Sequence, residues 1–243
     1  MSWVANSVFV RPILAVALLA TASAAFADIL VVRSSGPSAK SYPPGKRMPE
    51  AARLTLKAGD QIIVLDGRGT RIIRGPGTFA AGAAAPARIA SANPSGDRRA
   101  RIGAVRGVET GPIRPPSIWH VDVSKSSNVC VADGGKLTLW RADAAKAAAM
   151  TVSGPDGLRR QLVWQPGTTT LAWPADLPVA EVGEYRLSGP GAASPTVLRF
   201  RKVLQRPAGL EDMAQTLIRN DCQAQLDLFI ETVKLPDARA PAG

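Results

Sequence analysis

The sequence is poor in the residues on which most catalytic and metal sites depend. Its 243 residues include one histidine and two cysteines, too few for the usual four-ligand zinc shell of Cys and His. No Gly-x-Ser-x-Gly elbow is present, and the single His120 stands near Asp122 in the strand-like IWHVDV, which is typical of an exposed or satisfied strand residue. We therefore expect a non-enzymatic protein with no catalytic residue, cofactor or metal. A hydrolase stays open as an alternative, because 19 acidic residues are spread along the chain.

Long apolar runs are also scarce. PILAVALLATASA follows Arg11 and is shorter than the roughly 20 residues of a membrane-spanning helix. Ala25 and Ala27 are small residues at the two positions that a signal peptidase recognises, which predicts a signal peptide over 1–27 and cleavage before Asp28. An uncleaved anchor is the alternative. Cleavage would leave a periplasmic or secreted protein without a transmembrane segment.

The interpretation of the two cysteines depends on that compartment. An even pair in an oxidising space predicts a structural disulfide between Cys130 and Cys222. Two buried free thiols are the alternative.

Phosphate-binding loops are missing as well. The glycine-rich LKAGDQIIVLDGRGTRIIRGPGTF has no Lys followed by Ser or Thr, as a P-loop requires. GPGTFA matches the dinucleotide spacing only nominally, because Pro76 interrupts it. We conclude that these glycines turn the chain.

What the sequence does contain is frequent turns. Twenty-two glycines and twenty prolines separate short apolar runs, which predicts a mainly β fold. Strands are expected over 29–34, 53–56, 61–65 and 70–75, within a small β domain over 28–79. The dipeptide Asp66-Gly67, between two apolar runs, predicts a hairpin.

One resemblance follows from the turns of this part. Ala58-Gly59-Asp60, an apolar strand, the turn from Asp66 through Gly67 to Gly69, a second apolar strand and Gly75-Pro76-Gly77 resemble the core of FecR-type periplasmic β domains. The resemblance covers residues 54–79. It implies a non-catalytic domain of envelope signalling or scaffolding proteins. FecR regulators have a membrane helix ahead of this domain, whereas only a short signal is expected here, so the resemblance implies an accessory rather than a direct sigma-factor regulator.

Residues 80–116 have the composition of an Arg/Pro/Gly-rich linker. The formal net charge of the chain is +11, and this stretch contributes a local excess of arginines that are candidates for anion binding: Arg88, Arg98, Arg99, Arg101, Arg106 and Arg114. An exported basic stretch without interleaved aromatic residues is not expected to bind nucleic acid. Anionic glycan or lipid headgroups are its candidate ligands, and a solvated linker is the alternative.

Residues 117–204 alternate apolar and polar residues between turn signals. Eight strand candidates at this spacing predict a β-sandwich, with its tryptophans in the core or, alternatively, forming a carbohydrate platform. Gly183-Glu184-Tyr185 resembles the tyrosine corner of immunoglobulin-like sandwiches. The resemblance implies that fold and a structural role for Gly183 and Tyr185.

The C-terminal part is helical. Apolar residues recur at three- and four-residue steps over 208–234, which predicts a helix or helix pair packed on the sandwich, with a partner-binding helix as the alternative. Asn220-Asp221 is the expected break, with Asn220 in a left-handed cap and Asp221 capping a second segment. Residues 235–243 are expected to be a frayed tail.

Together these features predict an exported cell-envelope interaction protein, a sensory or scaffolding accessory whose partner is an envelope protein. The alternative is a binder of anionic envelope glycan or lipid.

Overall fold

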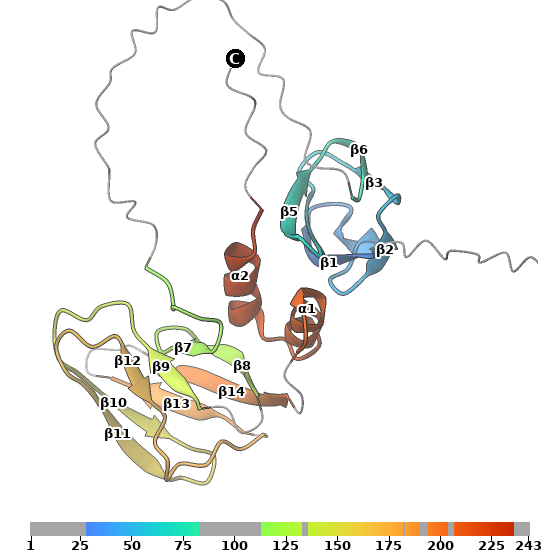
Figure 1. Cartoon of the computed structure of the whole chain (residues 1–243). Coiled ribbons are helices and arrows are strands. Elements are labelled where there is room, and N and C mark those ends of the chain that lie inside the picture. The colour runs from blue at the N-terminus through green and yellow to red at the C-terminus, as the bar shows by residue number, and fades with distance from the viewer. Residues whose placement is uncertain are drawn as a thin grey trace, which may run out of the picture.

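The computed structural model describes residues 28–82, 113–132, 136–181, 183–189, 194–203 and 207–235. Figure 1 shows two β bodies with two short helices between them. The expected mainly β fold with a C-terminal helical segment is confirmed. The expected signal peptide, most of the expected linker and most of the expected tail lie outside the described residues.

The first body consists of six short strands. Four form an antiparallel sheet in the order β2-β1-β4-β5, and two pair as β3-β6. The strands are β1 (Asp28–Ser35), β2 (Arg47–Pro49), β3 (Arg53–Leu56), β4 (Gln61–Asp66), β5 (Gly69–Arg74) and β6 (Gly77–Ala80), with a 3-10 turn, η1 (Ala39–Ser41), after β1. The four expected strands are present. β2 and β6 were not expected, and Ala81 is buried in the same core, so this body continues past residue 79.

The central strands β1 and β4 are buried on both faces. Ile29 and Val31 pack with β3 and β6, whereas Leu30 and Val32 on the opposite face pack with the helices. A strand covered on both sides requires a continuous apolar run rather than alternation. This accounts for the runs ILVV and IIVL in the sequence.

The second body is a two-layer sandwich. A five-stranded sheet in the order β11-β10-β13-β14-β8 faces a three-stranded sheet in the order β12-β9-β7, and one apolar core lies between them. All eight expected strands are present: β7 (His120–Asp122), β8 (Ser127–Ala132), β9 (Thr138–Trp140), β10 (Ala148–Ser153), β11 (Arg159–Trp164), β12 (Thr170–Ala172), β13 (Tyr185–Ser188) and β14 (Thr196–Val203). Trp164 is fully buried in this core. The pairs β8–β14 and β7–β9 are parallel. β8 and β7 stand last in the strand orders, so each forms an edge of its sheet.

The helices α1 (Leu210–Arg219) and α2 (Gln223–Thr232) end and begin at the expected break. The expected capping geometry was wrong, because the left-handed residue is Asp221, with φ 54°, and the N-cap of α2 is Cys222. Asp221 N–H donates to the Ile218 carbonyl and Cys222 N–H to the Leu217 carbonyl. These two bonds form a Schellman motif, which requires the left-handed residue one position after Asn220.

The helix pair joins the two bodies. The expected disulfide between Cys130 and Cys222 is confirmed, with a Cα–Cα distance of 5.9 Å, and it ties the turn between the helices to β8. On the other side, Arg47 of β2 pairs with Glu211 of α1 at 2.6 Å. The helices therefore pack on the first body as well as on the sandwich. Neither helix of the described residues combines the length and hydropathy of a membrane span.

The end of α2 is also fixed to the first body. Thr70 N–H donates to the Val233 carbonyl, Leu235 N–H donates to the Thr70 carbonyl, and the Thr70 hydroxyl donates to the Ile230 carbonyl at 2.8 Å. Lys234 thus forms a parallel bridge with Thr70, and Leu235, expected to begin the frayed tail, is held against β5.

Candidate functional site

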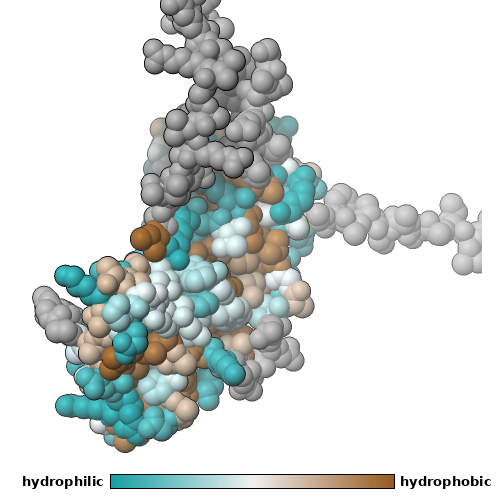
Figure 2. All heavy atoms as spheres, turned by 60° about the vertical axis from the view of Figure 1, so that its left-hand side comes forward, coloured by the Kyte–Doolittle hydropathy of each residue, from teal (hydrophilic) through white to brown (hydrophobic). Residues whose placement is uncertain are grey.

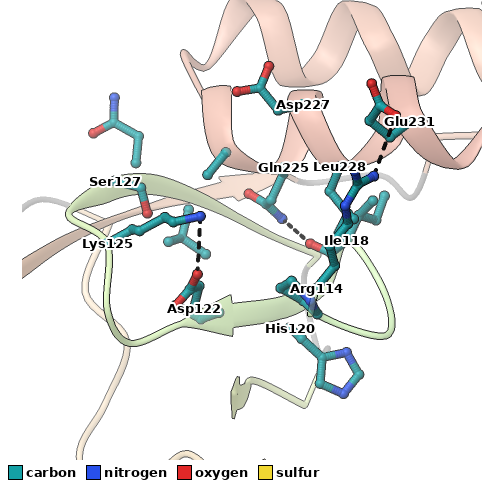
Figure 3. A pocket seen from close by; sticks show the side chains of 15 residues that line it. Arg114, Ile118, His120, Asp122, Lys125, Ser127, Gln225, Asp227, Leu228 and Glu231 are labelled. Atoms are coloured by element: carbon teal, nitrogen blue, oxygen red, sulfur yellow. Dashed lines mark hydrogen bonds and ion pairs between the residues drawn. The ribbon is translucent and has the colours of Figure 1, made fainter. Parts of the chain in front are cut away.

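A pocket of about 260 Å³ lies where the edges of the two sandwich sheets meet α2. Figure 3 shows its position between β7, the loop to β8, and the helix. Its apolar lining consists of a floor, formed by Ile118, Val121 and Val129, and of Leu228 on the side of α2. Since β7 and β8 belong to different sheets and pair with β9 and β14, the pocket lies between two strand edges.

Gln225 forms one end of the pocket and is almost fully buried. Its side-chain oxygen accepts a hydrogen bond from Cys130 N–H at 2.6 Å, and its side-chain nitrogen donates to the Cys130 carbonyl at 2.9 Å. The same nitrogen donates to the Ile118 carbonyl at 2.9 Å. One side chain of α2 therefore satisfies the outward peptide groups of β8 at Cys130, as a neighbouring strand would.

Charged side chains at the mouth are paired with one another. Arg114 contacts Glu231 at 3.4 Å, and Lys125 contacts Asp122 at 3.5 Å. Asp122 also accepts hydrogen bonds from the backbone N–H and the hydroxyl of Ser124, at 2.9 and 2.6 Å. This carboxylate therefore fixes the turn between β7 and β8, as Asp commonly does two residues before the donor.

The acidic wall of the pocket belongs to α2. Asp227 and Glu231 are four residues apart, so they lie on one side of the helix, and both line the pocket. Asp227 is paired with Arg33 of β1. Both carboxylates are solvent-exposed, so their ion pairs contribute only about 0 to 1 kcal/mol each.

His120 also lines the pocket, from the opposite strand. Its side chain is half-buried, and in the described part of the chain its Nδ1 atom has no hydrogen-bond partner. Among the described residues, no cluster of three or more His, Cys, Asp or Glu side chains is arranged to hold a metal ion.

Of the arginines proposed to bind anions, Arg114 lies at the mouth of the pocket, where it pairs with Glu231. The others fall outside the described residues: Arg88, Arg98, Arg99, Arg101 and Arg106.

The glycine-rich turn is a structural site. Asp66 lies opposite Gly69 in the β4–β5 hairpin and accepts hydrogen bonds from Arg68 N–H at 2.8 Å and Gly69 N–H at 3.2 Å. Burial alone raises the pKa of Asp66. The backbone and side-chain hydrogen bonds from Arg68, with the charges of Arg71 and Arg68, outweigh burial and lower the pKa below its ordinary value.

Positive φ in this turn occurs at Gly69 and not at Gly67. Gly69 has φ 146°, and a Cβ there would lie 2.3 Å from the Val233 carbonyl oxygen. A Cβ at Gly67 would meet nothing within 4 Å. Gly69 is therefore required both for its backbone conformation and for the close approach of the C-terminal segment.

The motifs Ala58-Gly59-Asp60 and Gly75-Pro76-Gly77 of the first body contact each other at Asp60. This buried carboxylate accepts hydrogen bonds from the backbone N–H groups of Ser38 and Lys57, and the Asp60 carbonyl accepts one from Gly75 N–H at 3.0 Å. Burial raises the pKa of Asp60, but the hydrogen bonds from Ser38 and Lys57 outweigh it, so that the pKa is lowered. The bond from Gly75 to Pro76 is cis, and Gly77 begins β6.

Tyr185 is a structural residue of the sandwich. Its hydroxyl donates to the Pro178 carbonyl at 2.6 Å and accepts from Ala180 N–H at 2.7 Å. The ring packs edge-on against Trp173 and Phe200 in the core. Gly183 lies two residues before Tyr185, the first residue of β13.

The sequence did not indicate Gln225 as a functional residue. Its one signal was a polar side chain three residues after Cys222, within the apolar stripe. Comparison with known proteins adds no assignment, since no protein-family model and no curated protein matches the sequence.

Proposed function

We propose that this chain is an exported, non-enzymatic interaction protein of the cell envelope, a sensory or scaffolding accessory. The observation that carries the proposal is the pocket between β7, β8 and α2, which combines an apolar floor with the edges of two sheets. Sheet edges present unpaired peptide groups and are a common place for another chain to bind. The signal-like N-terminus and the disulfide support export.

The exposed surface supports a localised interaction. In the part of the chain that the structure describes, the exposed large hydrophobic side chains are Ile113, Leu158 and Val163. Figure 2 shows hydrophilic side chains interspersed with hydrophobic ones over the sandwich. Scattered apolar residues do not form an interaction patch, which favours the pocket as the place where a partner binds.

The carboxylates around the pocket support binding rather than hydrolysis. Asp122 caps a turn and pairs with Lys125, Asp227 pairs with Arg33, and Glu231 pairs with Arg114. A general acid and base pair needs two carboxylates in contrasting environments that face one reacting group. These three instead each have a basic partner.

The alternative, binding of anionic glycan or lipid, is favoured by a different surface. On the face of the five-stranded sheet that points away from the core, β11, β13 and β14 present four arginines: Arg159, Arg186, Arg199 and Arg201. Glu184 pairs with two of these, Arg186 and Arg199. Such a face attracts polyanions in a salt-dependent way.

Affinity capture from solubilised envelope of the native host tests the proposal and its alternative together. Three forms of the mature protein serve as bait: wild type, Ala224→Trp to fill the pocket, and a variant with Arg159, Arg186 and Arg199 changed to Ala. The proposal expects one protein that wild type and the arginine variant retain and Ala224→Trp loses, at both about 0.1 M and about 0.5 M salt. Capture lost in the arginine variant and at high salt would favour the polyanion instead.

A further inference from the structure

The edge of β8 beside the pocket is paired along only part of its length. Gln225 binds the peptide N–H and C=O of Cys130, which shows that these groups point away from β14. Peptide groups of alternate residues in a strand point to the same side. Those of Asn128, two residues earlier, therefore also point away from β14, and Asn128 lines the pocket.

The pocket offers room for side chains next to this edge. Val129 and Val121 form the floor below the strand edges, and Leu228 of α2 forms the opposite wall. Successive side chains of an extended chain alternate in direction. A chain paired with Asn128 would thus direct one side chain into the apolar floor and the next toward the helix.

The helix wall specifies the charge of that second side chain. Asp227 and Glu231 both line the pocket from α2, and their present partners Arg33 and Arg114 reach them from other segments through exposed ion pairs. Exposed pairs of this kind are weak and exchange readily. A lysine or arginine of an incoming chain would meet two carboxylates one helical turn apart.

We infer that the pocket binds an extended peptide segment of a partner protein, paired with the β8 edge at Asn128, with a small apolar side chain on the floor and a lysine or arginine beside Asp227 and Glu231. The inference rests on the proposed function and specifies the partner's binding segment. At about 260 Å³ the pocket is smaller than the roughly 300 to 1,000 Å³ of most small-molecule sites, and one side chain with its peptide group suits it better than a metabolite.

A phage-displayed library of random heptapeptides, panned on the mature protein, provides the probe. We expect enriched sequences with a lysine or arginine next to a small apolar residue, and at least tenfold weaker binding of the corresponding synthetic peptides to Ala224→Trp. Ala224 is exposed and lines the pocket, whereas the exposed Ala175 does not, so Ala175→Trp is the matched control that should bind as wild type does.

Two substitutions at one position test strand pairing. Asn128→Ala removes the side-chain bonds to Asp221 but keeps the peptide N–H, whereas Asn128→Pro removes both. The N–H that proline removes points away from β14, so the β8–β14 ladder is kept. We expect Asn128→Pro to bind at least tenfold more weakly than Asn128→Ala, with both folded by circular dichroism.

Charge reversal in the probe completes the test. Peptides with glutamate in place of the basic residue should lose binding, and the double variant Asp227→Asn, Glu231→Gln should lose the preference for the basic residue. No enrichment, or equal binding by Ala224→Trp and wild type, would overturn the inference. If envelope capture is lost in Ala224→Trp while no peptide is enriched, the proposed function stands and the peptide inference fails.

Discussion

The side-chain amide of Gln225 forms with the Cys130 peptide both hydrogen bonds that a neighbouring β-strand would form. Gln225 belongs to a helix, and Cys130, which donates one of these bonds and accepts the other, is half of the disulfide to Cys222. A covalent bond and a peptide-like clamp thus act on the same point of β8. The helix pair that walls the pocket is held there by both.

Replacement of Gln225 by alanine should destabilise the protein by about 2 to 4 kcal/mol, because Cys130 N–H and two carbonyl groups lose a buried partner. Urea unfolding of the oxidised protein measures the loss. Gln223→Ala is the matched control on the same helix, since Gln223 is exposed, and it should change stability by less than about 0.5 kcal/mol. Equal losses of stability for the two substitutions would contradict the stabilising role of the Gln225 hydrogen bonds.

Reduction of the disulfide should lower stability by about 2 to 5 kcal/mol, since the bridge closes a sequence separation of 92 residues. For a chain of this size that corresponds to a fall in Tm of roughly 5 to 15 °C. Differential scanning calorimetry with and without reductant measures it. The double variant Cys130→Ser, Cys222→Ser should melt at the lower temperature in both buffers, and sensitivity to reductant in that variant would exclude the bridge as the cause.

Alanine at Gly69 should destabilise the first β body by about 2 to 4 kcal/mol, because φ 146° is strained for alanine and the new Cβ would meet the Val233 carbonyl oxygen. Gly67→Ala, in the same turn, meets nothing within 4 Å and should be nearly neutral. Thermal melts of the two variants side by side measure the difference. A larger loss of stability for Gly67→Ala than for Gly69→Ala would contradict the assignment of Gly69 as the strained residue.

Because of Asp66, the free energy of unfolding should decrease at acid pH. Its pKa is lowered below the ordinary value of 3.8 in the folded protein, so the folded state binds a proton less readily than the unfolded chain. Its contribution is present in full above the ordinary pKa and is lost as pH falls through the lower folded-state pKa. Asp66→Asn should be less stable at pH 7 and should show a smaller decline on acidification. Parallel pH profiles of wild type and Asp66→Asn would contradict this.

Export predicts a defined mature N-terminus. Cleavage after Ala27 should give a protein that begins at Asp28, the first residue of β1. N-terminal sequencing of protein purified from the native host identifies the start. An N-terminus at Met1 on a protein that fractionates with the membrane would instead support the uncleaved anchor.

The sequence predicts the elements that depend on local patterns. The β-branched runs of both bodies, the hairpin at Asp66, the helix break before Cys222 and the cysteine pair all follow from spacing, turn chemistry and compartment. Each of the first three signals is confined to a short stretch of chain. The fourth depends only on there being two cysteines, each of which has the other as its partner.

The candidate site depends on relations that no local pattern contains. Parallel pairing of β8 with β14 joins strands far apart in the sequence, and it leaves β8 at a sheet edge. The role of Gln225 exists only because that edge faces α2. The two-sided burial of β1 is visible as a continuous apolar run, but the run does not say that a C-terminal helix pair covers one side.

Photo-cross-linking in living cells shows whether this protein binds its partner through the pocket between β7, β8 and α2. A benzophenone amino acid is placed at Ala224, which lines the pocket, or at Ala175, which does not. We predict one discrete cross-linked protein from position 224 and none from position 175. Identical cross-linking patterns from the two positions, or no product from 224, would contradict it.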